Sequence, residues 1–446
     1  MRLAPRNARI AVVGAGWAGL AAAVELCAAG MRPVVFEAAK QIGGRARRVE
    51  FHGHPLDNGQ HILAGAYHET LRVMKRVGAD PERLFHRFPL EIEHALAGFR
   101  LALPESGNIF GKTLNLASAF FMAQGAPFDE KIAGARFVQS LKRRGFRLSE
   151  DCAASELYDR SGLRGKMRRY FWDPICLSAL NTPPEKASAQ ILANVLRDTL
   201  DGAQSDTDFL LPATDMSALF PDAAAAFIDA NGGELRVQRR VGALRPEANE
   251  IFIDEEAFGH VILAVAPQHA LTLLESHAEA RATVEILSTY AFETIGTVYA
   301  AYPEEIDLPA RMRGMECDAP GSIGQWVFDR GRLDERNRGI FSFVLSSSAN
   351  GWEEYDDDAL ASRLHRELET LLKCSLPAPR WTRVVRDRRA TLSCRPKLQR
   401  PAAETPIAGL QLAGDYVYAD YPATIESAVR SGVAAAARVV EKARAQ

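Results

Sequence analysis

The chain has 446 residues, of which 47% are hydrophobic and 25% are charged, and its formal net charge is −2. A chain longer than roughly 250–300 residues tends to divide into more than one core, so we expect two domains. The near-neutral charge and the lack of a recognisable nucleic-acid motif argue against binding to nucleic acid.

Cysteine usage and hydropathy indicate the compartment. The six cysteines are scattered and form no C-x-x-C pair, which indicates reduced thiols with neither a disulfide framework nor a metal site. The sequence contains no run of about 18 apolar residues, the length needed to span a bilayer. Residues 1–9 are too short and too polar for a secretory signal. We therefore expect a cytoplasmic protein, with contact to the surface of the inner membrane as the alternative.

Residues 10–37 have the pattern of a dinucleotide-binding unit. An apolar, β-branched run over residues 10–13 predicts a buried strand, residues 20–29 predict an alanine-rich helix, and residues 33–36 predict a second strand. Glu37 closes that second strand. A carboxylate at this position can accept hydrogen bonds from two ribose hydroxyls and would repel a 2′-phosphate.

Three glycines separate the first strand from the helix at G-x-G-x-x-G spacing, namely Gly14, Gly16 and Gly19. The first permits a tight turn, the second lets a pyrophosphate approach the backbone, and the third lets the helix pack closely on the strand. The helix N-terminus offers unpaired N–H groups and a partial positive charge to the phosphates. The pattern predicts a bound dinucleotide. The alternative is a glycine-rich turn in another kind of α/β domain.

The remaining chain contains further helical and strand-like segments. After a second glycine pair, Gly43 and Gly44, the sequence becomes mainly helical between residues 67 and 208, with helical spacing of apolar residues over 114–122 and 132–141. Later segments favour strands at 234–237, 241–244, 260–267, 286–347 (antiparallel) and 409–415, and helices at 360–372 and 424–442.

Elements typical of nucleotide binding thus occur near the start, the middle and the end of the chain. This order indicates an α/β fold, in which a doubly wound, Rossmann-like domain is interrupted by an α+β substrate domain with a mainly helical insertion. We expect the nucleotide-binding domain to comprise residues 1–68, 206–268 and 400–446. The substrate domain would then comprise residues 69–205 and 269–399.

Two motifs outside the first glycine loop resemble those of the flavin-containing superfamily of amine oxidases, protoporphyrinogen oxidases and carotenoid desaturases. They are Gly43-Gly44-Arg45 after the second strand and Gly414-Asp415 at the end of a late strand. The resemblance implies a non-covalent FAD extended along the first domain. The alternatives are a solvated surface arginine for Arg45 and an ordinary helix-capping or turn residue for Asp415.

The same resemblance implies a role for each matching residue. Glu37 would contact the adenosine ribose, the Val241 backbone would contact adenine, and Arg45, a planar cation with several donors, would contact phosphate or ribose. The other implied cofactor contacts are Gly59 and Gln60 beside the isoalloxazine ring, Asp415 near the pyrophosphate and ribityl chain, and Thr424 and Ile425.

Two further stretches resemble the hydroxysqualene dehydroxylases, also called squalene-associated FAD-dependent desaturases. They are Asp57–Leu63 and Phe171–Pro183, and residues 414–428 fit the same group. The resemblance implies removal of the hydroxyl from hydroxysqualene, a C30 isoprenoid alcohol, to give squalene in bacterial squalene and hopanoid synthesis. A dry substrate pocket would include Phe171, Trp172, Leu180 and Asn181. The alternative is that these are core residues of a helical insertion.

The implied reaction needs a proton donor as well as a hydride donor. His61 is the first candidate, because imidazole titrates near neutral pH and its turn should approach the flavin ring. The alternative is a structural histidine that follows a turn. Asp173 and Glu426 are further candidates, for which the alternatives are a helix-end residue and a helix cap, respectively. NAD(P)H is a candidate reductant, although the sequence contains no second dinucleotide fingerprint.

Residues 109–147 combine an apolar helical stretch with a basic cluster. This combination favours a surface that contacts the membrane and collects a lipid-dissolved substrate. The alternative is a helical cap whose apolar face is buried in the substrate domain. Contact with other enzymes of the squalene pathway is a further expectation for so apolar a substrate.

Three rival functions remain open from the sequence. The nearest is a carotenoid or squalene desaturase, which would run the flavin in the oxidising direction. An amine oxidase is disfavoured because residues 294–302 contain no lysine where such enzymes carry one. The third is a non-catalytic FAD-binding scaffold.

Overall fold

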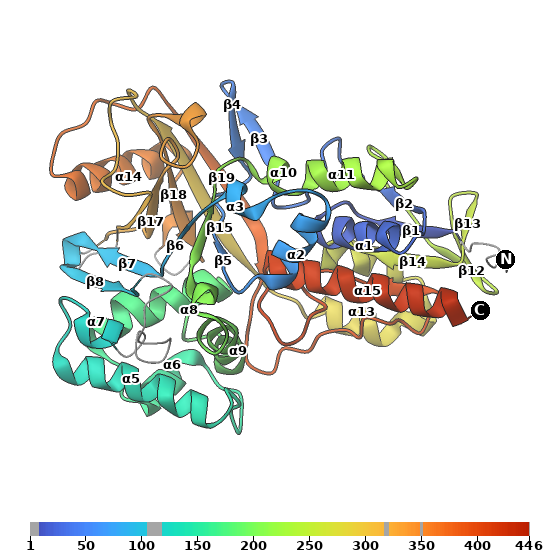
Figure 1. Cartoon of the computed structure of the whole chain (residues 1–446), viewed down its shortest axis with the longest axis horizontal. Coiled ribbons are helices and arrows are strands. Elements are labelled where there is room, and N and C mark those ends of the chain that lie inside the picture. The colour runs from blue at the N-terminus through green and yellow to red at the C-terminus, as the bar shows by residue number, and fades with distance from the viewer. Residues whose placement is uncertain (1–8, 105–117, 316–320, 348–350, 446) are drawn as a thin grey trace.

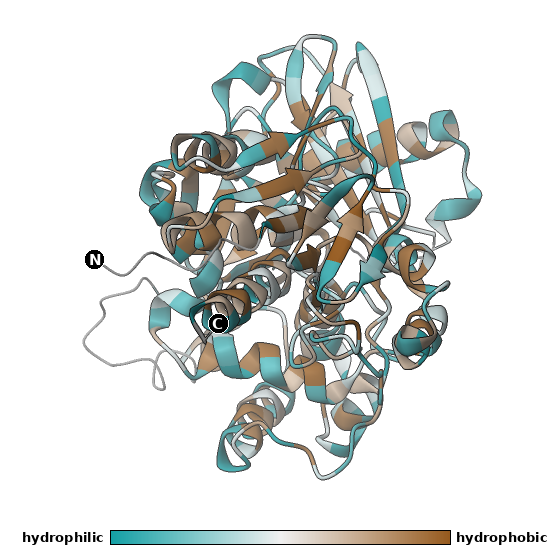
Figure 2. Cartoon of the chain, turned by 90° about the vertical axis from the view of Figure 1, so that its right-hand side faces the viewer, coloured by the Kyte–Doolittle hydropathy of each residue, from teal (hydrophilic) through white to brown (hydrophobic). Residues whose placement is uncertain are grey.

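The computed structural model describes residues 9–104, 118–315, 321–347 and 351–445. Figure 1 shows three regions: a nucleotide-binding region that contains both ends of the described chain, a large, mainly antiparallel sheet, and a helical lobe below that sheet. In Figure 2 the hydrophobic residues concentrate on the strands and inner helices in the middle of the molecule.

The nucleotide-binding region is built on a five-stranded parallel sheet of order β10-β2-β1-β14-β20. Its central strands, β1 (Ile10–Val13), β2 (Pro33–Phe36) and β14 (His260–Leu263), are buried along their whole length. Continuous apolar runs of this kind are typical of parallel strands with both faces covered. β10 (Glu234–Arg236) and β20 (Leu410–Leu412) form the edges.

Alternate side chains of β1 enter separate cores on the two faces of this sheet. Ile10 and Val12 pack with helices α1 (Trp17–Ala28), α2 (His68–Arg76), α11 (Pro221–Ala230) and α15 (Ile425–Ala445). Ala11 and Val13 pack with α12 (Pro267–Leu274) and α13 (Arg281–Ser288). Consecutive residues of a strand face opposite sides, so the four-residue run supplies both cores.

This packing differs from the expected domain boundaries at residues 68 and 268. Residues of α2 lie in the same core as α1 and α15. Those of α12 and α13 lie in the core on the other face of the parallel sheet. Both segments were expected in the substrate domain. Their apolar faces cover the nucleotide-binding sheet, which a periodic pattern alone cannot reveal.

The second region is a seven-stranded sheet of order β19-β15-β18-β17-β16-β7-β8. Its longest strands are β15 (Phe292–Ala301), β18 (Ile340–Ser346) and β19 (Trp381–Leu392). β15 and β18 pair antiparallel as expected for residues 286–347, whereas β19, which also pairs antiparallel with β15, was not predicted. Helix α14 (Asp357–Leu372) packs Leu360, Leu364 and Leu368 onto one face. The other strands are β17 (Trp326–Asp329), β16 (Met312–Gly314), β7 (Glu91–His94) and β8 (Phe99–Ala102).

The helical lobe surrounds an aromatic core that includes Phe120, Phe137, Tyr158 and Trp172. A π-helical turn, Arg168–Trp172, joins its shortest helix to α8; π-turns often occur at functional sites. The lobe contains α5 (Phe128–Arg143), α6 (Ala154–Arg160), α7 (Gly165–Met167), α8 (Asp173–Leu180) and α9 (Ala189–Leu200).

Short elements connect the three regions. A hairpin of β3 (Arg48–Phe51) and β4 (His54–Asp57) follows the second glycine pair. A three-stranded sheet holds β5 (Leu63–Ala64), β9 (Phe209–Pro212) and β6 (Phe85–Phe88). The remaining short elements are α3 (Pro81–Leu84), α10 (Met216–Leu219), β11 (Arg245–Glu247), β12 (Glu250–Ile253) and β13 (Glu256–Phe258).

Most predicted elements are present, but one strand is not. Residues 241–244 have no regular structure, because no neighbouring strand lies alongside to complete a ladder. The helix expected over 132–141 lies within α5. Of the helix expected over 114–122, residues 118–122 are helical and Leu114 and Leu116 lie outside the described residues.

Candidate functional site

The first glycine loop has no room for side chains at two of its positions. Gly14 has φ of +103°, and a Cβ there would lie 2.5 Å from the carbonyl oxygen of Ala264. A Cβ on Gly19 would lie 1.9 Å from the carbonyl oxygen of Gly14. A Cβ on Gly16 would meet nothing closer than 3.8 Å. Gly14 and Gly19 are therefore required by the fold, whereas Gly16 leaves open space.

The second glycine pair lies directly against the first loop. The Gly43 amide donates to the Ala15 carbonyl at 2.8 Å. A Cβ on Gly44 would lie 3.1 Å from Cα of Gly16. Beside these loops, the N-terminus of α1 carries no side-chain cap and no acidic residue in its first turn. The first amides of a helix have no partner within it, so they remain available to an anion.

Glu37 lies at the end of β2 with its carboxylate beside the first loop. Its Oε2 accepts from the Ala15 amide and its Oε1 from the Ala39 amide, both at 2.8 Å. The chain after β10 runs alongside, since the Arg239 amide donates to the Glu37 carbonyl at 2.8 Å. Val241 follows two residues later, near the predicted adenosine end of the site.

Arg45 and Asp415 are 370 positions apart in sequence, yet they form an ion pair at 2.6 Å between Nη2 and Oδ2. The carboxylate of Asp415 raises the pKa of Arg45 above its usual value. Arg400 supports the pair by donating to the Asp415 carbonyl at 2.7 Å. The two residues expected to contact the cofactor therefore also contact each other, and join the start of the chain to its end.

The closing helix begins next to this ion pair. The Gly414 amide donates to the Ser431 hydroxyl on α15 at 2.8 Å. Thr424 precedes Ile425, the first residue of α15, and the Thr424 amide donates to the Ser427 hydroxyl at 3.0 Å. The late glycine motif therefore contacts the second turn of α15, and Thr424 lies directly before that helix.

A bulge in β19 links this ion pair to the other two regions. The β15–β19 register shifts so that residues 388–390 face Thr294 alone. At the bulge, the Ala390 carbonyl accepts from Nη1 of Arg45 at 2.6 Å. Asn181, at the end of α8, donates to the Thr391 hydroxyl at 2.9 Å. Bulges are over-represented next to active sites. Sequence reasoning missed Ala390 because its contribution is a backbone carbonyl.

The Gly59–His61 turn contacts β15, an interior strand of the seven-stranded sheet. Gly59 has φ of +110°, and the Gln60 amide donates to the Thr297 hydroxyl at 3.3 Å. Nδ1 of His61 lies 2.8 Å from the Gly59 carbonyl, so Nδ1 carries the hydrogen. Burial, with the nearby charges of Arg330 and Arg45, lowers the pKa of His61 to about 4.

This geometry disfavours His61 as a proton donor in the cofactor-free protein. At neutral pH its ring is uncharged and its Nε2 carries a lone pair, so the ring accepts a hydrogen bond at that atom. The sequence reasoning used the ordinary pKa of imidazole and could not foresee two nearby arginines.

The side chain of Gln60 points into the protein interior. Its Oε1 accepts from Nη1 of Arg330 at 3.0 Å and from the Ser342 hydroxyl at 2.9 Å. Its Nε2 donates to the His61 carbonyl at 2.9 Å. Arg330, which is fully buried, also pairs with Asp57. No motif marked Arg330 as a functional residue.

The other two acid candidates have different surroundings. Asp173 lies in the first turn of α8, 3.5 Å from Nε of Arg168, and burial raises its pKa to about 6. Glu426 is fully buried and accepts from the amides of Glu69 and Thr70 at 3.1 and 2.9 Å. It therefore caps α2, and its carboxylate is held by structural bonds.

The predicted pocket residues Phe171, Trp172 and Leu180 lie in the aromatic core of the helical lobe. Trp172 stacks on Phe120 with centroids 5.7 Å apart. Each of the four side chains is at most 4% exposed. In this structure they contact one another, whereas Asn181 reaches the β19 bulge. A substrate role for the three core residues remains a prediction.

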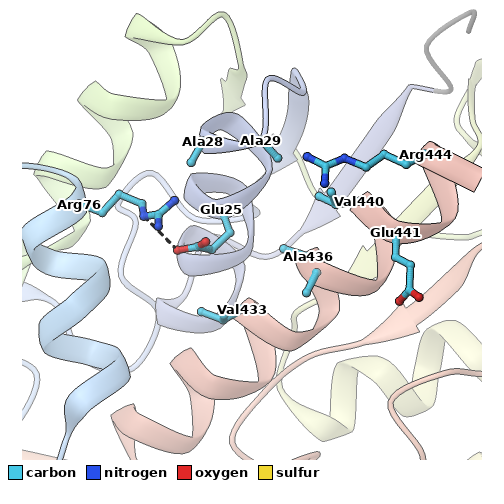
Figure 3. A pocket seen from close by; sticks show the side chains of 10 residues that line it. Glu25, Ala28, Ala29, Arg76, Val433, Ala436, Val440, Glu441 and Arg444 are labelled. Carbon is cyan, nitrogen blue, oxygen red and sulfur yellow. Dashed lines mark ion pairs between the residues drawn. The ribbon is translucent and has the colours of Figure 1, made fainter. Parts of the chain in front are cut away.

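A separate groove lies among the helices of the nucleotide-binding region (Figure 3). It has a volume of about 500 Å³ and lies between the C-terminal half of α1, Arg76 of α2 and the second half of α15. Its lining includes Glu25, Ala436 and Arg444. None of the predicted cofactor residues lines this groove. Among the described residues, no cluster of His, Cys, Asp or Glu could hold a metal ion.

The residues present fit an extended FAD. The uncapped α1 N-terminus and the open space at Gly16 suit a pyrophosphate. Glu37 at the end of β2 suits a ribose. Arg45 and Asp415 lie together beyond the loops.

Comparisons with known proteins agree with a flavin-binding site. A family model described as flavin containing amine oxidoreductase matches residues 17–440. Hydroxysqualene dehydroxylase from Zymomonas mobilis is 27% identical over 435 residues, which cover 95% of this chain and 97% of the relative. The enzyme of the same name from Rhodopseudomonas palustris is 28% identical over 453 residues, covering 97% and 99%. Zeta-carotene desaturase from Synechocystis is 22% identical and covers 98% of both chains.

Solved structures show the same fold. An oxidoreductase from Methanosarcina mazei superposes with a TM-score of 0.72 at 16% identity, covering 96% of this chain and 100% of the other. Cyclohexylamine oxidase from Brevibacterium oxydans gives a TM-score of 0.64 at 16% identity, covering 98% and 100%. The chain belongs to the flavin-containing amine oxidoreductase family and is an FAD-dependent oxidoreductase.

Proposed function

We propose that this protein removes the hydroxyl group of hydroxysqualene to give squalene, as a step of bacterial squalene and hopanoid synthesis. The observation that carries the proposal is the similarity to two hydroxysqualene dehydroxylases along nearly the whole chain, at 27% and 28% identity. The zeta-carotene desaturase relative is less similar, at 22%.

The proposed reaction replaces an allylic C–O bond by a C–H bond. Reduced FAD supplies the hydride that forms the new C–H bond. The hydroxyl leaves with one proton as water, so the protein must hold an acid near that oxygen and exclude bulk water.

We propose that the two glycine loops and the ends of the chain hold the FAD. In this assignment Gly14, Gly16 and Gly19 shape the first loop, and Gly43 and Gly44 the second. Glu37 binds the adenosine ribose and the Val241 backbone lies against adenine. The remaining assigned contacts are Arg45, Gly59, Gln60, Gly414, Asp415, Thr424 and Ile425.

Of the two catalytic candidates, Asp173 and His61, we assign Asp173 as the proton donor. Its pKa of about 6 leaves part of the population protonated near neutral pH, whereas the ring of His61 is uncharged. We assign His61 Nε2 the role of accepting a hydrogen bond from the substrate hydroxyl. Asp173→Asn should abolish turnover, and His61→Asn should raise KM more than it lowers kcat.

The deciding experiment incubates the purified enzyme, reduced anaerobically with dithionite, with hydroxysqualene. We expect squalene, identified by mass spectrometry, together with reoxidation of the flavin. Formation of no squalene overturns the proposal. If the oxidised enzyme instead inserts double bonds into squalene, the protein is a desaturase. Replacing dithionite by NADH or NADPH tests whether a nicotinamide is the reductant.

We also propose that the helical lobe docks on an anionic membrane to reach its apolar substrate. Phe121, Met122 and Phe128 are 45%, 78% and 65% exposed, and the two phenylalanine rings lie 6.0 Å apart. Exposed Arg136 and Arg143 follow Phe128 along one face of α5. Exposed aromatic residues beside cations favour contact with anionic lipid. No helix in the described part of the chain has the length and hydropathy of a membrane span.

Flotation with anionic vesicles tests this docking. Phe121→Ser combined with Phe128→Ser should abolish flotation while leaving the melting temperature nearly unchanged. Phe120→Ser is unsuitable for this purpose, because Phe120 is only 1% exposed and stacks on Trp172. Flotation unchanged by the double substitution contradicts the docking proposal. Capture of another squalene-pathway enzyme in place of vesicles would instead indicate transfer by direct contact.

A further inference from the structure

Arg330 is a fully buried arginine outside every motif that the sequence marks. It follows β17, and both it and its partner Asp57 have side chains no more than 1% exposed. The distance between Nη2 of Arg330 and Oδ2 of Asp57 is 3.4 Å, longer than a strong charge-assisted bond. Nε of Arg330 has no hydrogen-bond partner among the described residues. A buried ion pair with so long a distance and an unpartnered donor contributes little to stability.

The contacts of Arg330 lead directly to the Gly59–His61 turn. Nη1 donates to Oε1 of Gln60 at 3.0 Å, and the Ser342 hydroxyl donates to the same oxygen at 2.9 Å. Two donors fix the orientation of the Gln60 amide, so that its nitrogen faces the turn. That nitrogen donates to the His61 carbonyl at 2.9 Å. The side chain of Gln60 thus connects the buried cation to the backbone of the turn.

Asp57 holds the other side of Arg330 in place. Its Oδ1 accepts from the Met216 amide at 2.7 Å, and its carbonyl accepts from the Tyr299 hydroxyl at 3.0 Å. These contacts anchor the pair to α10 and to β15. The network is therefore rigid at its Asp57 end and meets the cofactor-facing turn at its Gln60 end.

Arg330 also acts on the turn through its charge. The charged groups that influence His61 are Arg330, Arg45 and Asp387, which come from three different segments. The two arginines oppose protonation of the imidazole and Asp387 favours it.

We propose that Arg330 is a positioning residue for the cofactor site, which fixes the Gly59–His61 turn through Gln60 and makes the surface of that turn electropositive. The inference rests on the proposed placement of FAD beside Gly59. A buried positive charge at this position favours the reduced, more negative form of a bound flavin.

The test measures FAD affinity, the pKa of His61 in the apoprotein by NMR, and the midpoint potential of the bound flavin. In Arg330→Met we expect FAD affinity to fall about tenfold or more, because a charged hydrogen bond is lost. We also expect the pKa of His61 to rise and the potential to become more negative. Arg330→Lys keeps the charge without the paired donors, so it should lower FAD affinity and leave the pKa of His61 low.

Arg313→Met is the control, because Arg313 forms an ion pair with Glu93 in the same seven-stranded sheet, although these side chains are 18% and 24% exposed. It should reduce stability without moving any of the three readouts. If Arg330→Met does not fold, Ser342→Ala removes the other donor that orients the Gln60 amide while keeping the Asp57–Arg330 pair, and should lower FAD affinity alone.

The inference is overturned if the variants that fold leave FAD affinity within twofold of wild type and the His61 pKa unmoved. Neither measurement uses an isoprenoid. A failure here is therefore distinguishable from failure to form squalene.

Discussion

The nucleotide-binding region and the helical lobe use their residues in different ways. In the first, function depends on glycines whose missing side chains leave the backbone exposed, such as Gly16 beside the α1 N-terminus. In the second, the residues predicted to be functional are large aromatic side chains packed against one another, such as Trp172 on Phe120. A substitution in the lobe should therefore act first on stability, whereas one at Gly16 should act first on cofactor binding.

The largest expected effect is on the lobe. Trp172→Ala removes a side chain that is 1% exposed and should lower the free energy of unfolding by about 3–5 kcal/mol. FAD affinity of the folded fraction should stay close to wild type, because the glycine loops pack in a different core. Denaturant unfolding and FAD titration measure the two quantities. The matched control is Trp381→Ala, a partly exposed tryptophan on β19 that should cost less. If Trp172→Ala lowered the free energy of unfolding by less than Trp381→Ala does, the lobe core would be loosely packed.

Within the loops, two alanine substitutions should separate folding from binding. Gly19→Ala places a Cβ 1.9 Å from the Gly14 carbonyl oxygen and should cost about 3 kcal/mol or prevent folding. Gly16→Ala has open space and should leave apoprotein stability nearly unchanged, yet its methyl group would obstruct a pyrophosphate and weaken FAD binding. Thermal unfolding of the apoprotein and calorimetry with FAD measure both effects. Equal FAD affinity in Gly16→Ala and wild type would contradict the assigned phosphate site.

Glu426→Gln tests a residue that joins two helices of the nucleotide-binding region. The substitution keeps the shape but removes the charge that Arg430 and the first amides of α2 contact. We expect a loss of about 2 kcal/mol in the free energy of unfolding, as for other charged hydrogen bonds. Flavin reduction kinetics should remain normal. A kinetic defect without loss of stability would restore Glu426 as a catalytic candidate.

The smallest expected effect is a pH dependence at Asp173. Burial raises its pKa from 3.8 to about 6, so between these values the folded state keeps a proton that the unfolded state has lost. Wild-type stability from this group therefore falls as pH rises from about 4 to 6. Asp173→Asn and Asp173→Ala both lack this pH-dependent loss of stability. The melting temperature of each variant, relative to that of wild type, should therefore rise as the pH increases from about 4 to 6. A relative loss would contradict the sign.

The sequence was most informative where structure is local. The glycine loops, the Glu37 strand and the closing helix depend on residues close in sequence, and the structure contains them as predicted. Residues 241–244 were wrongly predicted as a strand because pairing depends on a distant neighbour. Arg330 and the Ala390 carbonyl were missed for the same reason, since each meets its partner across a gap of more than 200 residues.

Residue type alone does not distinguish the core of the helical lobe from its surface. Phe120 and Phe121 are adjacent and identical in type, yet one is 1% and the other 45% exposed. Only the packing of the lobe separates a core residue from a surface residue here.

The parallel sheet combines strands from the start, the middle and the end of the chain, and this order has a consequence for biosynthesis. Its strand order places β20 beside β14, and α15 packs so closely on α1 that a Cβ on Gly432 would lie 2.1 Å from the Ala18 carbonyl oxygen. Synthesis proceeds from the N-terminus, so the nascent chain exposes its first glycine loop long before Asp415 and α15 leave the ribosome. Flavin capture should therefore be a post-translational event. A chain stalled before residue 400 would emerge with an open, unfilled nucleotide fold that chaperones must protect.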